Sequence, residues 1–307
     1  MATFLQQLVN GLTLGCIYAL VALGYTLVYG ILELINFAHG DLVMLGALLS
    51  LSLMRLFLDW GIPLPGAVAL ALAGAMAGCV GVGLLLERLA YRPLRQAPKL
   101  APLITAIGLS MTLEQGAALI WGRDYLAFPD LGLSHSWVFG GIVVTAIQGV
   151  IGGGTLLLLT VLLWIIHRSS LGRAMRATAQ NPVAAQLLGV DTDRSIALAF
   201  VIGAALAAVA GLMVGAYYQV GHYTMGFMLG LKAFTAAVLG GIGNLQGAVL
   251  GGLVLGLLEA LGAGYLGDWT HNVFGSNYKD VFAFALLIAV LIFHPSGLLG
   301  RHAPEKV

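Results

Sequence analysis

Four polar side chains interrupt one of the most apolar stretches of this chain. The stretch YGILELINFAHGDLVMLGALL, residues 29–49, contains Glu33, Asn36, His39 and Asp41. Carboxylates in such a setting could carry protons, and a histidine could hold a metal ion. No second His or Cys sits at ligand spacing from His39, which disfavours a metal site. An aspartyl hydrolase would need a partner for Asp41, and no second membrane aspartate is expected to supply one.

The surroundings of these residues follow from composition. Of the 307 residues, 60% are hydrophobic and only 9% are charged, and the mean hydropathy is +0.97. A soluble domain has about a quarter of its residues charged, so this chain has too few charges to cover a core with polar surface. The composition predicts an all-α, polytopic membrane bundle that forms one domain over residues 1–307. A net charge of +1 offers no electrostatic case for nucleic acid.

The apolar runs predict where the chain crosses the bilayer, because a membrane helix needs about 20 mostly apolar residues. We expect eight or nine spans, since the second, fifth and seventh candidate runs are short. The candidate spans are roughly residues 8–30, 42–58, 63–86, 100–121, 151–167, 195–218, 228–243, 247–266 and 280–294.

Basic residues predict the orientation, because cytoplasmic loops carry an excess of Lys and Arg. Ten of the 14 basic residues fall in three segments of the chain. Because successive spans cross the membrane in alternating directions, all three segments lie on the same side of it. The ten residues are Arg88, Arg92, Arg95, Lys99, Arg168, Arg173, Arg176, Arg194, Arg301 and Lys306. The C-terminus is therefore predicted to be cytoplasmic. Nine spans would place the N-terminus outside, and eight would place it inside.

With this orientation, residues 31–41 lie at the cytoplasmic end of the first span, and two interpretations stay open. In one, a loop exposes Glu33 and Asp41 to cytoplasmic water. In the other, a broken helix places Asn36, His39 and Gly40 at the wall of a path through the membrane. A carboxylate at mid-bilayer costs about 2.5–3.5 kcal/mol on insertion scales, so each interpretation must give the charges water, a cavity or a partner.

Further polar or unusual positions lie deeper in the spans. Glu114, Lys232 and Glu259 each place a charge within or at the edge of an apolar run. Such charges indicate a functional path by default, but an ion pair between helices satisfies the same energetics. Gly240, Gly241 and Gly243 in AVLGGIGN are dense enough to predict an unwound segment that lines a cavity, although glycine also serves ordinary helix packing.

The cytoplasmic segment of about 168–194 contains the boundary signals of a short helix. Asn181 is a favoured N-cap, Pro182 suits the first helical position, and Gly189 suits the left-handed residue after the last turn. The apolar face at helical spacing consists of Val183, Ala184, Leu187 and Leu188. This helix could rest on lipid headgroups or dock another cytoplasmic protein. No G-x-x-x-x-G-K-[ST] motif occurs, so any ATPase would be a separate chain attached here.

Several stretches, in one order along nearly the whole chain, carry a family resemblance. The LivH-type permease subunit of branched-chain amino acid ABC importers is similar to this chain at ELINFAHGD, ERLAYRPLR, LGRAMRATAQNP, LLGVDTDRSIALAFVIGAALAAVAG, KAFTAAVLGGIG and YKDVFAFALLIAVLIFHPSGLLGR. The resemblance implies a bacterial cytoplasmic (inner) membrane permease paired with a LivM-type permease. It also implies two cytoplasmic ATPase subunits that bind the ATP, an extracytoplasmic substrate-binding protein, and no cofactor on this chain.

The resemblance also bears on the coupling loop. Many importer permeases carry Glu-Ala-Ala-x-x-x-Gly there, and the matching residues are Val183, Ala184, Ala185 and Gly189, with valine at the acidic position. We therefore expect Arg173 and Arg176 to supply the polar contact with the ATPase.

Two other functions stay open on the sequence. A proton-coupled secondary transporter would use Glu33, Asp41, Glu114 or Glu259 as proton sites and would work without partner chains. A LivH-like permease could instead serve urea, short amides or other small organic solutes, because external binding proteins commonly set selectivity in such systems.

Overall fold

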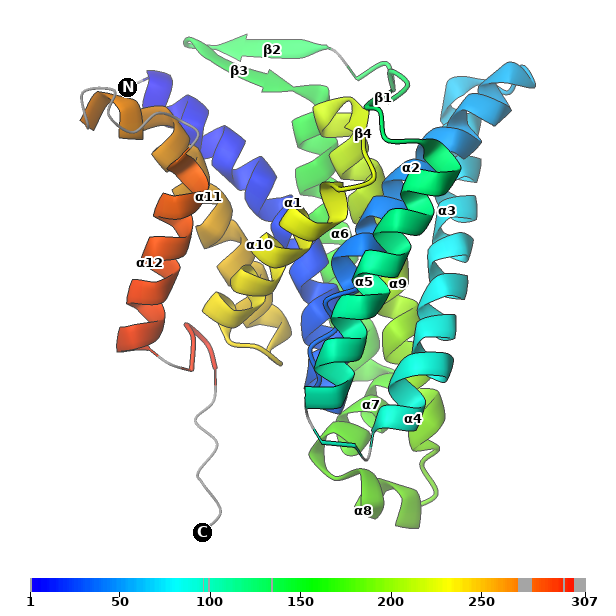
Figure 1. The fold of residues 1–307 in the computed structure, drawn as a ribbon. Coiled ribbons are helices and arrows are strands. Elements are labelled where there is room, and N and C mark those ends of the chain that lie inside the picture. The colour runs from blue at the N-terminus through cyan, green and yellow to red at the C-terminus, as the bar shows by residue number, and fades with distance from the viewer. Residues whose placement is uncertain are drawn as a thin grey trace.

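The computed structural model describes residues 2–95, 97–98, 100–133, 135–269, 278–294 and 296–300. They form a bundle of long helices (Figure 1), which confirms the predicted polytopic helical fold. The long helices are α1 (Ala2–Leu32), α2 (His39–Asp59), α3 (Leu64–Leu86), α5 (Leu100–Trp121), α6 (Ala146–Arg168), α9 (Thr192–Tyr218), α10 (Met225–Gly240), α11 (Leu245–Trp269) and α12 (Lys279–Phe293). Three predicted cytoplasmic basic residues, Lys99, Arg301 and Lys306, lie outside the described residues.

Each of the nine predicted spans coincides with one of these helices, and seven helices of the described chain are long and apolar enough to cross a membrane. α10 has 16 residues, or about 24 Å at 1.5 Å per residue. It is shorter than the hydrocarbon core of about 30 Å, as predicted. The prediction that the second and fifth spans are short is wrong, since α2 and α6 have 21 and 23 residues. Both helices begin before the predicted runs, and each has a polar residue in its first turn, Asp41 in α2 and Gln148 in α6.

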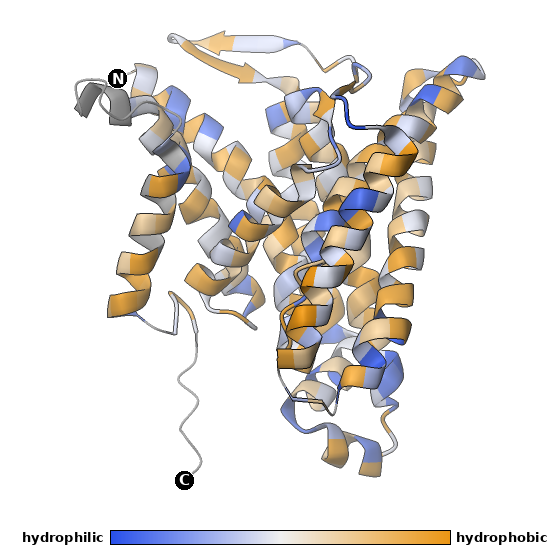
Figure 2. Ribbon diagram, viewed as in Figure 1, coloured by the Kyte–Doolittle hydropathy of each residue, from blue (hydrophilic) through white to orange (hydrophobic). Residues whose placement is uncertain are grey.

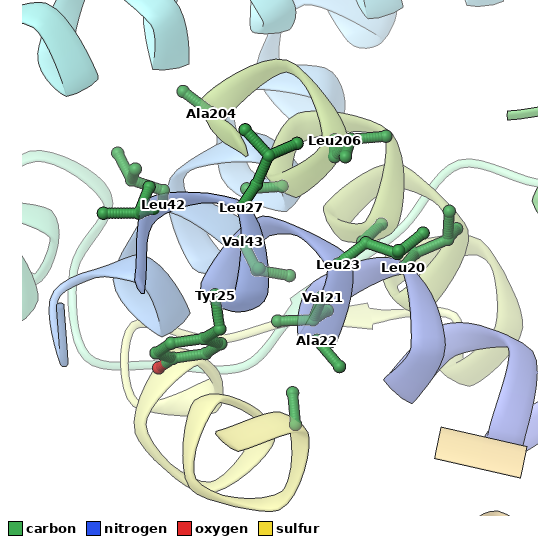
Figure 3. Packing of buried hydrophobic residues seen from close by; sticks show 14 of the residues in the cluster. Leu20, Val21, Ala22, Leu23, Tyr25, Leu27, Leu42, Val43, Ala204 and Leu206 are labelled. Atoms are coloured by element: carbon green, nitrogen blue, oxygen red, sulfur yellow. The ribbon is translucent and has the colours of Figure 1, made fainter. Parts of the chain in front are cut away.

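The centre of the bundle is formed by α1, α2 and α9, whose side chains are mostly buried. Figure 3 shows Leu23 and Leu27 of α1 packed among Val43 of α2 and Leu206 of α9. α3, α5 and α6 bury far fewer of their side chains and form the periphery. This difference in burial between the central and the peripheral helices suits a bundle whose outer helices contact lipid or another membrane subunit.

Glycine allows the central helices to approach closely. A Cβ at Gly15 of α1 would lie 2.7 Å from the Cα of Leu253 in α11, and a Cβ at Gly211 of α9 would lie 2.2 Å from the carbonyl oxygen of Val43 in α2. No larger side chain fits at either crossing without moving a backbone. Glycine at these two positions therefore serves close helix packing, as small residues commonly do between membrane helices.

The two ends of the bundle differ in structure. At one end lie the π-helical turn η1 (Glu87–Tyr91), α4 (Arg92–Leu94), α7 (Ser170–Gln180) and α8 (Pro182–Leu187), where Figure 2 shows many hydrophilic residues. At the other end are two ribbons that the all-α prediction did not include. In one, β1 (Leu126–Ala127) pairs with β4 (Val220–Gly221), and in the other, β2 (Ser136–Phe139) pairs with β3 (Ile142–Thr145), both antiparallel.

Candidate functional site

The polar cluster that follows α1 is largely buried. α1 ends at Leu32, Glu33 has a left-handed backbone with φ of 53°, and the chain re-enters the bundle before α2 begins at His39. Asn36, His39 and Asp41 are at most 2% exposed, whereas Glu33 is exposed. The loop interpretation is therefore wrong for Asp41, because the re-entering chain carries it into the bundle. The helix is broken, as the second interpretation expected.

Asn36 and His39 are engaged in packing. The hydroxyl of Tyr91 donates a hydrogen bond of 2.7 Å to Asn36 Oδ1. His39 packs edge-on against Tyr25, with ring centroids 4.8 Å apart, and it fills the space that a side chain at Gly24 would need. These contacts hold the break between α1 and α2 in place. In the part of the chain that the structure describes, no group of three or more His, Cys, Asp or Glu residues could hold a metal ion.

A cavity of about 540 Å³ lies between α1, α5, α10 and the connection that precedes α2. Its lining residues are Tyr25, Phe37, Ile107, Ser110, Met111, Glu114, Phe227 and Leu231. Figure 3 shows Tyr25 extending from α1 toward α10. Ser110 is the eleventh of the 22 residues of α5, so at 1.5 Å per residue it lies about 15 Å from either end of that helix. The cavity therefore lies at about the middle of the length of α5.

Asp41 lies behind the cavity wall, beside the hydroxyl of Ser110. A Cβ at Gly226 would lie 3.0 Å from Asp41 Oδ1, so the first turn of α10 packs directly against this carboxylate. The positive end of a helix dipole stabilises a negative group at this position. The structure thus brings Asp41 of α2 and Glu114 of α5, which are far apart in the sequence, to one side of the bundle.

Lys232 and Glu259 form an ion pair, one of the two alternatives that the sequence left open. Lys232 Nζ lies 2.9 Å from Glu259 Oε1 and 2.7 Å from Asp280 Oδ1. The hydroxyl of Tyr18 donates a hydrogen bond of 2.6 Å to Glu259 Oε2. This network joins α1, α10, α11 and α12, and none of its four side chains lines the cavity. Its contacts explain these charges as structural.

Sequence reasoning missed Tyr18 and Asp280. Tyr18 carries no charge and stands within an apolar run, so nothing in the sequence marks it. The position of Asp280 at the start of a predicted span was the one available signal, because an acidic residue there needs a partner or water.

The short helix α8 has the predicted boundaries. Asn181 Oδ1 accepts a hydrogen bond of 2.9 Å from the backbone N–H of Ala184, and Pro182 occupies the first turn. Gly189 has a φ of 81°, the left-handed conformation expected of it. Of the predicted apolar face, Val183, Leu187 and Leu188 are 66%, 84% and 83% exposed. Ala184 is exposed as well, and Ala185 alone within α8 is buried. Most of the surface of this face is therefore left uncovered by the described chain.

The two arginines expected to contact the ATPase differ in their surroundings. The guanidinium of Arg176 donates to the carbonyl oxygen of Ile166 in the last turn of α6. This contact anchors α7 on α6, so the structure engages Arg176 within its own chain. Arg173 is exposed and makes only a long contact of 3.4 Å with the carbonyl oxygen of Arg168. Its role as a contact for a partner stays a prediction.

An ion-pair cluster at the same end was also missed from the sequence. Arg95 Nη1 lies 2.6 Å from Asp193 Oδ1, Arg92 contacts the same carboxylate, and Arg95 also contacts Glu87. Asp193 is in the first turn of α9 and the other three residues follow α3. The cluster therefore ties the start of α9, directly after the α8 segment, to the end of α3. Only the fold brings together residues that lie about a hundred positions apart.

The glycine-rich segment after α10 is a tight turn. Gly240 is the last residue of α10, and Gly241 and Gly243 have φ values of 102° and 91°. This confirms the predicted unwound geometry. Gly243 lines a small cavity of about 120 Å³ with Thr26 and Arg176, among other residues, near the C-terminal end of α1. Gly240 packs against Gly247 at the start of α11 and is part of a helix contact.

A multi-pass helical bundle with a partly polar cavity at mid-depth, and an exposed capped helix at one end, defines a membrane transport permease. Residues 7–291 match the family described as "Branched-chain amino acid transport system / permease component". The match covers most of the chain, so the chain belongs to this family.

Individual relatives agree with this assignment. The chain is 47% identical to the "High-affinity branched-chain amino acid transport system permease protein LivH" of Escherichia coli (strain K12), covering 99% of this chain and 98% of that protein. It is also 47% identical to the permease protein BraD of Pseudomonas aeruginosa, with the same coverage. A probable LivH of Methanocaldococcus jannaschii is 29% identical over 92% of this chain and 88% of that protein. No solved structure matches the chain.

Proposed function

We propose that this chain is the permease subunit of an ATP-driven importer that moves branched-chain amino acids across a bacterial cytoplasmic membrane. It works with a second, LivM-type permease, two cytoplasmic ATPase subunits that bind the ATP, and an extracytoplasmic substrate-binding protein. The names of its relatives support the substrate class. The observation that carries the proposal is the exposed apolar face of α8, which lies at the end of the bundle rich in basic residues.

α8 is suited to receive force from an ATPase. The side chain of Gln186 donates to Thr192 Oγ1 at 2.7 Å, which joins α8 to the first residue of α9. α7 is held against α6 by Arg176, and also by the tight packing of Gly172 against the carbonyl oxygen of Ile166. Displacement of α8 by a moving ATPase would therefore reach both α6 and α9. This route supports a coupling role better than a resting place on lipid headgroups.

The cavity between α5 and α10 is the proposed segment of the translocation path. Glu114 lines it from α5, a peripheral helix with many exposed apolar residues. A carboxylate at this depth would be costly against lipid. The second permease is the neighbour that would cover this side of the bundle, so that the path runs between the two subunits. If α8 docks an ATPase, its end of the bundle is cytoplasmic. With nine spans, the C-terminus is then in the cytoplasm and the N-terminus is outside.

Site-directed crosslinking tests the docking assignment. In membranes containing the whole complex, cysteine at Leu187 or Leu188 should form crosslinks with an ATPase subunit, and cysteine at Trp60, at the far end of α2, should not. Leu187→Glu should abolish ATP-dependent leucine uptake without loss of membrane insertion, because it places a charge in an apolar contact, whereas Gln180→Glu should retain uptake. Failure of both α8 cysteines to capture an ATPase in an active complex would refute the assignment.

Substrate competition tests the transported class. Uptake of labelled leucine by the complex should be inhibited by excess isoleucine or valine and should be unchanged by excess urea. Uptake that is driven by a proton gradient without ATP, and by this chain alone, would contradict the importer assignment.

A further inference from the structure

The cavity between α1, α5 and α10 has an uneven distribution of polarity. Phe37, Ile107, Phe227 and Leu231 give most of its wall an apolar surface. Two polar side chains of α5 line the cavity, Ser110 and Glu114. They are three and seven positions after Ile107, so all three lie along one face of that helix. The volume of the cavity, about 540 Å³, is within the range of small-molecule sites. One polar strip facing apolar walls matches a ligand with one charged group and an aliphatic body.

The two carboxylates beside the cavity are not equivalent. Asp41 is fully buried, lies behind Ser110 and packs against the first turn of α10, and neither of its carboxylate oxygens has a hydrogen-bond partner among the described residues. Glu114 lines the cavity directly and is partly exposed. Within the residues that the structure describes, Glu114 makes no hydrogen bond or ion pair, in contrast to Glu259 and Glu87. A carboxylate at mid-membrane depth without a partner is suited to bind a cationic group that arrives with the substrate.

Resting on the proposed function, we infer that Glu114 binds the α-ammonium group of the amino acid during its passage, with the hydroxyl of Ser110 as a second acceptor. Phe37, Ile107, Phe227 and Leu231 then receive the branched aliphatic side chain. None of the residues that line the cavity is a cation. The nearby Lys232 is occupied by Glu259 and Asp280. We expect a cationic donor of the second permease to bind the substrate carboxylate and so to complete the site.

Thiol protection in the purified permease–ATPase complex measures binding at this site directly, without the binding protein that sets external selectivity. Met111→Cys places a reporter thiol on the cavity wall, and Ile107→Cys serves if the first variant does not transport. Leucine and leucinamide, which both carry the ammonium group, should slow labelling of this thiol by a maleimide. 4-Methylpentanoate has the same aliphatic body without the ammonium group, and it should give no protection.

Variants at α5 complete the test. Glu114→Gln should abolish protection and raise the KM for leucine uptake by the full complex about tenfold or more, because it replaces a charged hydrogen-bond partner by a neutral one. ATP hydrolysis stimulated by the loaded binding protein should persist, and Glu114→Asp should recover part of the uptake. Thr112→Val is the matched control, since Thr112 is exposed, bonds to the carbonyl oxygen of Gly108 and does not line the cavity.

The outcomes separate this inference from the proposed function. Equal protection by 4-methylpentanoate and leucine, or unchanged protection and KM in Glu114→Gln, would overturn the ammonium site while leaving the importer assignment intact. The same holds if no compound protects the thiol in a complex that transports leucine. If the complete wild-type complex takes up no leucine with ATP, the proposed function fails, and the inference fails with it.

Discussion

Replacement of Lys232 by methionine should destabilise the bundle strongly, although the new side chain is similar in length. Lys232 Nζ lies between Glu259 and Asp280, at 2.9 and 2.7 Å from their carboxylate oxygens. Its side chain is 13% exposed, and those of Glu259 and Asp280 are 2% and 29% exposed. Methionine would leave two carboxylates close together, one of them almost without access to water.

The magnitude follows from the burial of the remaining charges. Removal of one partner from a buried ion pair costs about 3–5 kcal/mol, because the other charge stays desolvated without compensation. Asp280 is partly exposed and adds little, so the loss is dominated by Glu259. The hydroxyl of Tyr18 keeps one hydrogen bond to Glu259 and relieves part of the cost. We expect Lys232→Met to lower the free energy of unfolding by about 3 kcal/mol.

Unfolding of the purified protein in mixed detergent micelles, followed by tryptophan fluorescence, measures this change. The double variant Lys232→Met/Glu259→Gln should recover most of the stability, because no deeply buried charge is then left unpaired. Arg194→Met is the control: its pair with Asp191 is exposed, and its loss should cost no more than about 0.5 kcal/mol. A loss below about 1 kcal/mol for Lys232→Met, or additive effects in the double variant, would refute the reasoning.

Two further perturbations follow from the packing and capping. Gly211→Leu should prevent assembly of a folded bundle, since its Cβ would lie 2.2 Å from the carbonyl oxygen of Val43, whereas Gly108→Leu on the open face of α5 should fold normally; size-exclusion chromatography of the detergent-solubilised protein distinguishes them. Asn181→Ala should weaken α8 by about 1 kcal/mol and lower the affinity for the ATPase about fivefold, measured by titration of the purified subunits. Gln180→Ala should leave that affinity unchanged, and equal effects of the two substitutions would contradict the capping role.

The helices and the caps of α8 could be predicted because their causes are local. A run of apolar residues is a span wherever it lies in the chain, and all nine predicted segments are helices. Asn181, Pro182 and Gly189 act within one or two turns of their own positions, and each has the predicted geometry. The lengths of α2 and α6 were underestimated because a polar residue in the first turn, Asp41 or Gln148, does not stop the helix.

The site could be predicted only in part. Residue type marked Asp41, Glu114, Lys232 and Glu259 as charges that need an explanation. The sequence could not decide which of them would pair with one another, because that depends on which helices are neighbours. Asp280, the second partner of Lys232, was missed for this reason. The family resemblance on the quoted motifs was confirmed over residues 7–291.

The sequence by itself determined that this chain lies in a membrane, where its helices run, and that α8 is a capped helix with an apolar face. These properties depend on composition and on residues within a few positions of one another. The tertiary structure alone decided that Asp41 is buried behind Ser110, that Lys232 neutralises Glu259, and that Glu114 faces a cavity and has no hydrogen-bond or ion-pair partner among the described residues. The physical reason is that the energy of a charge in a membrane depends on what packs against it, and packing joins residues far apart in the chain.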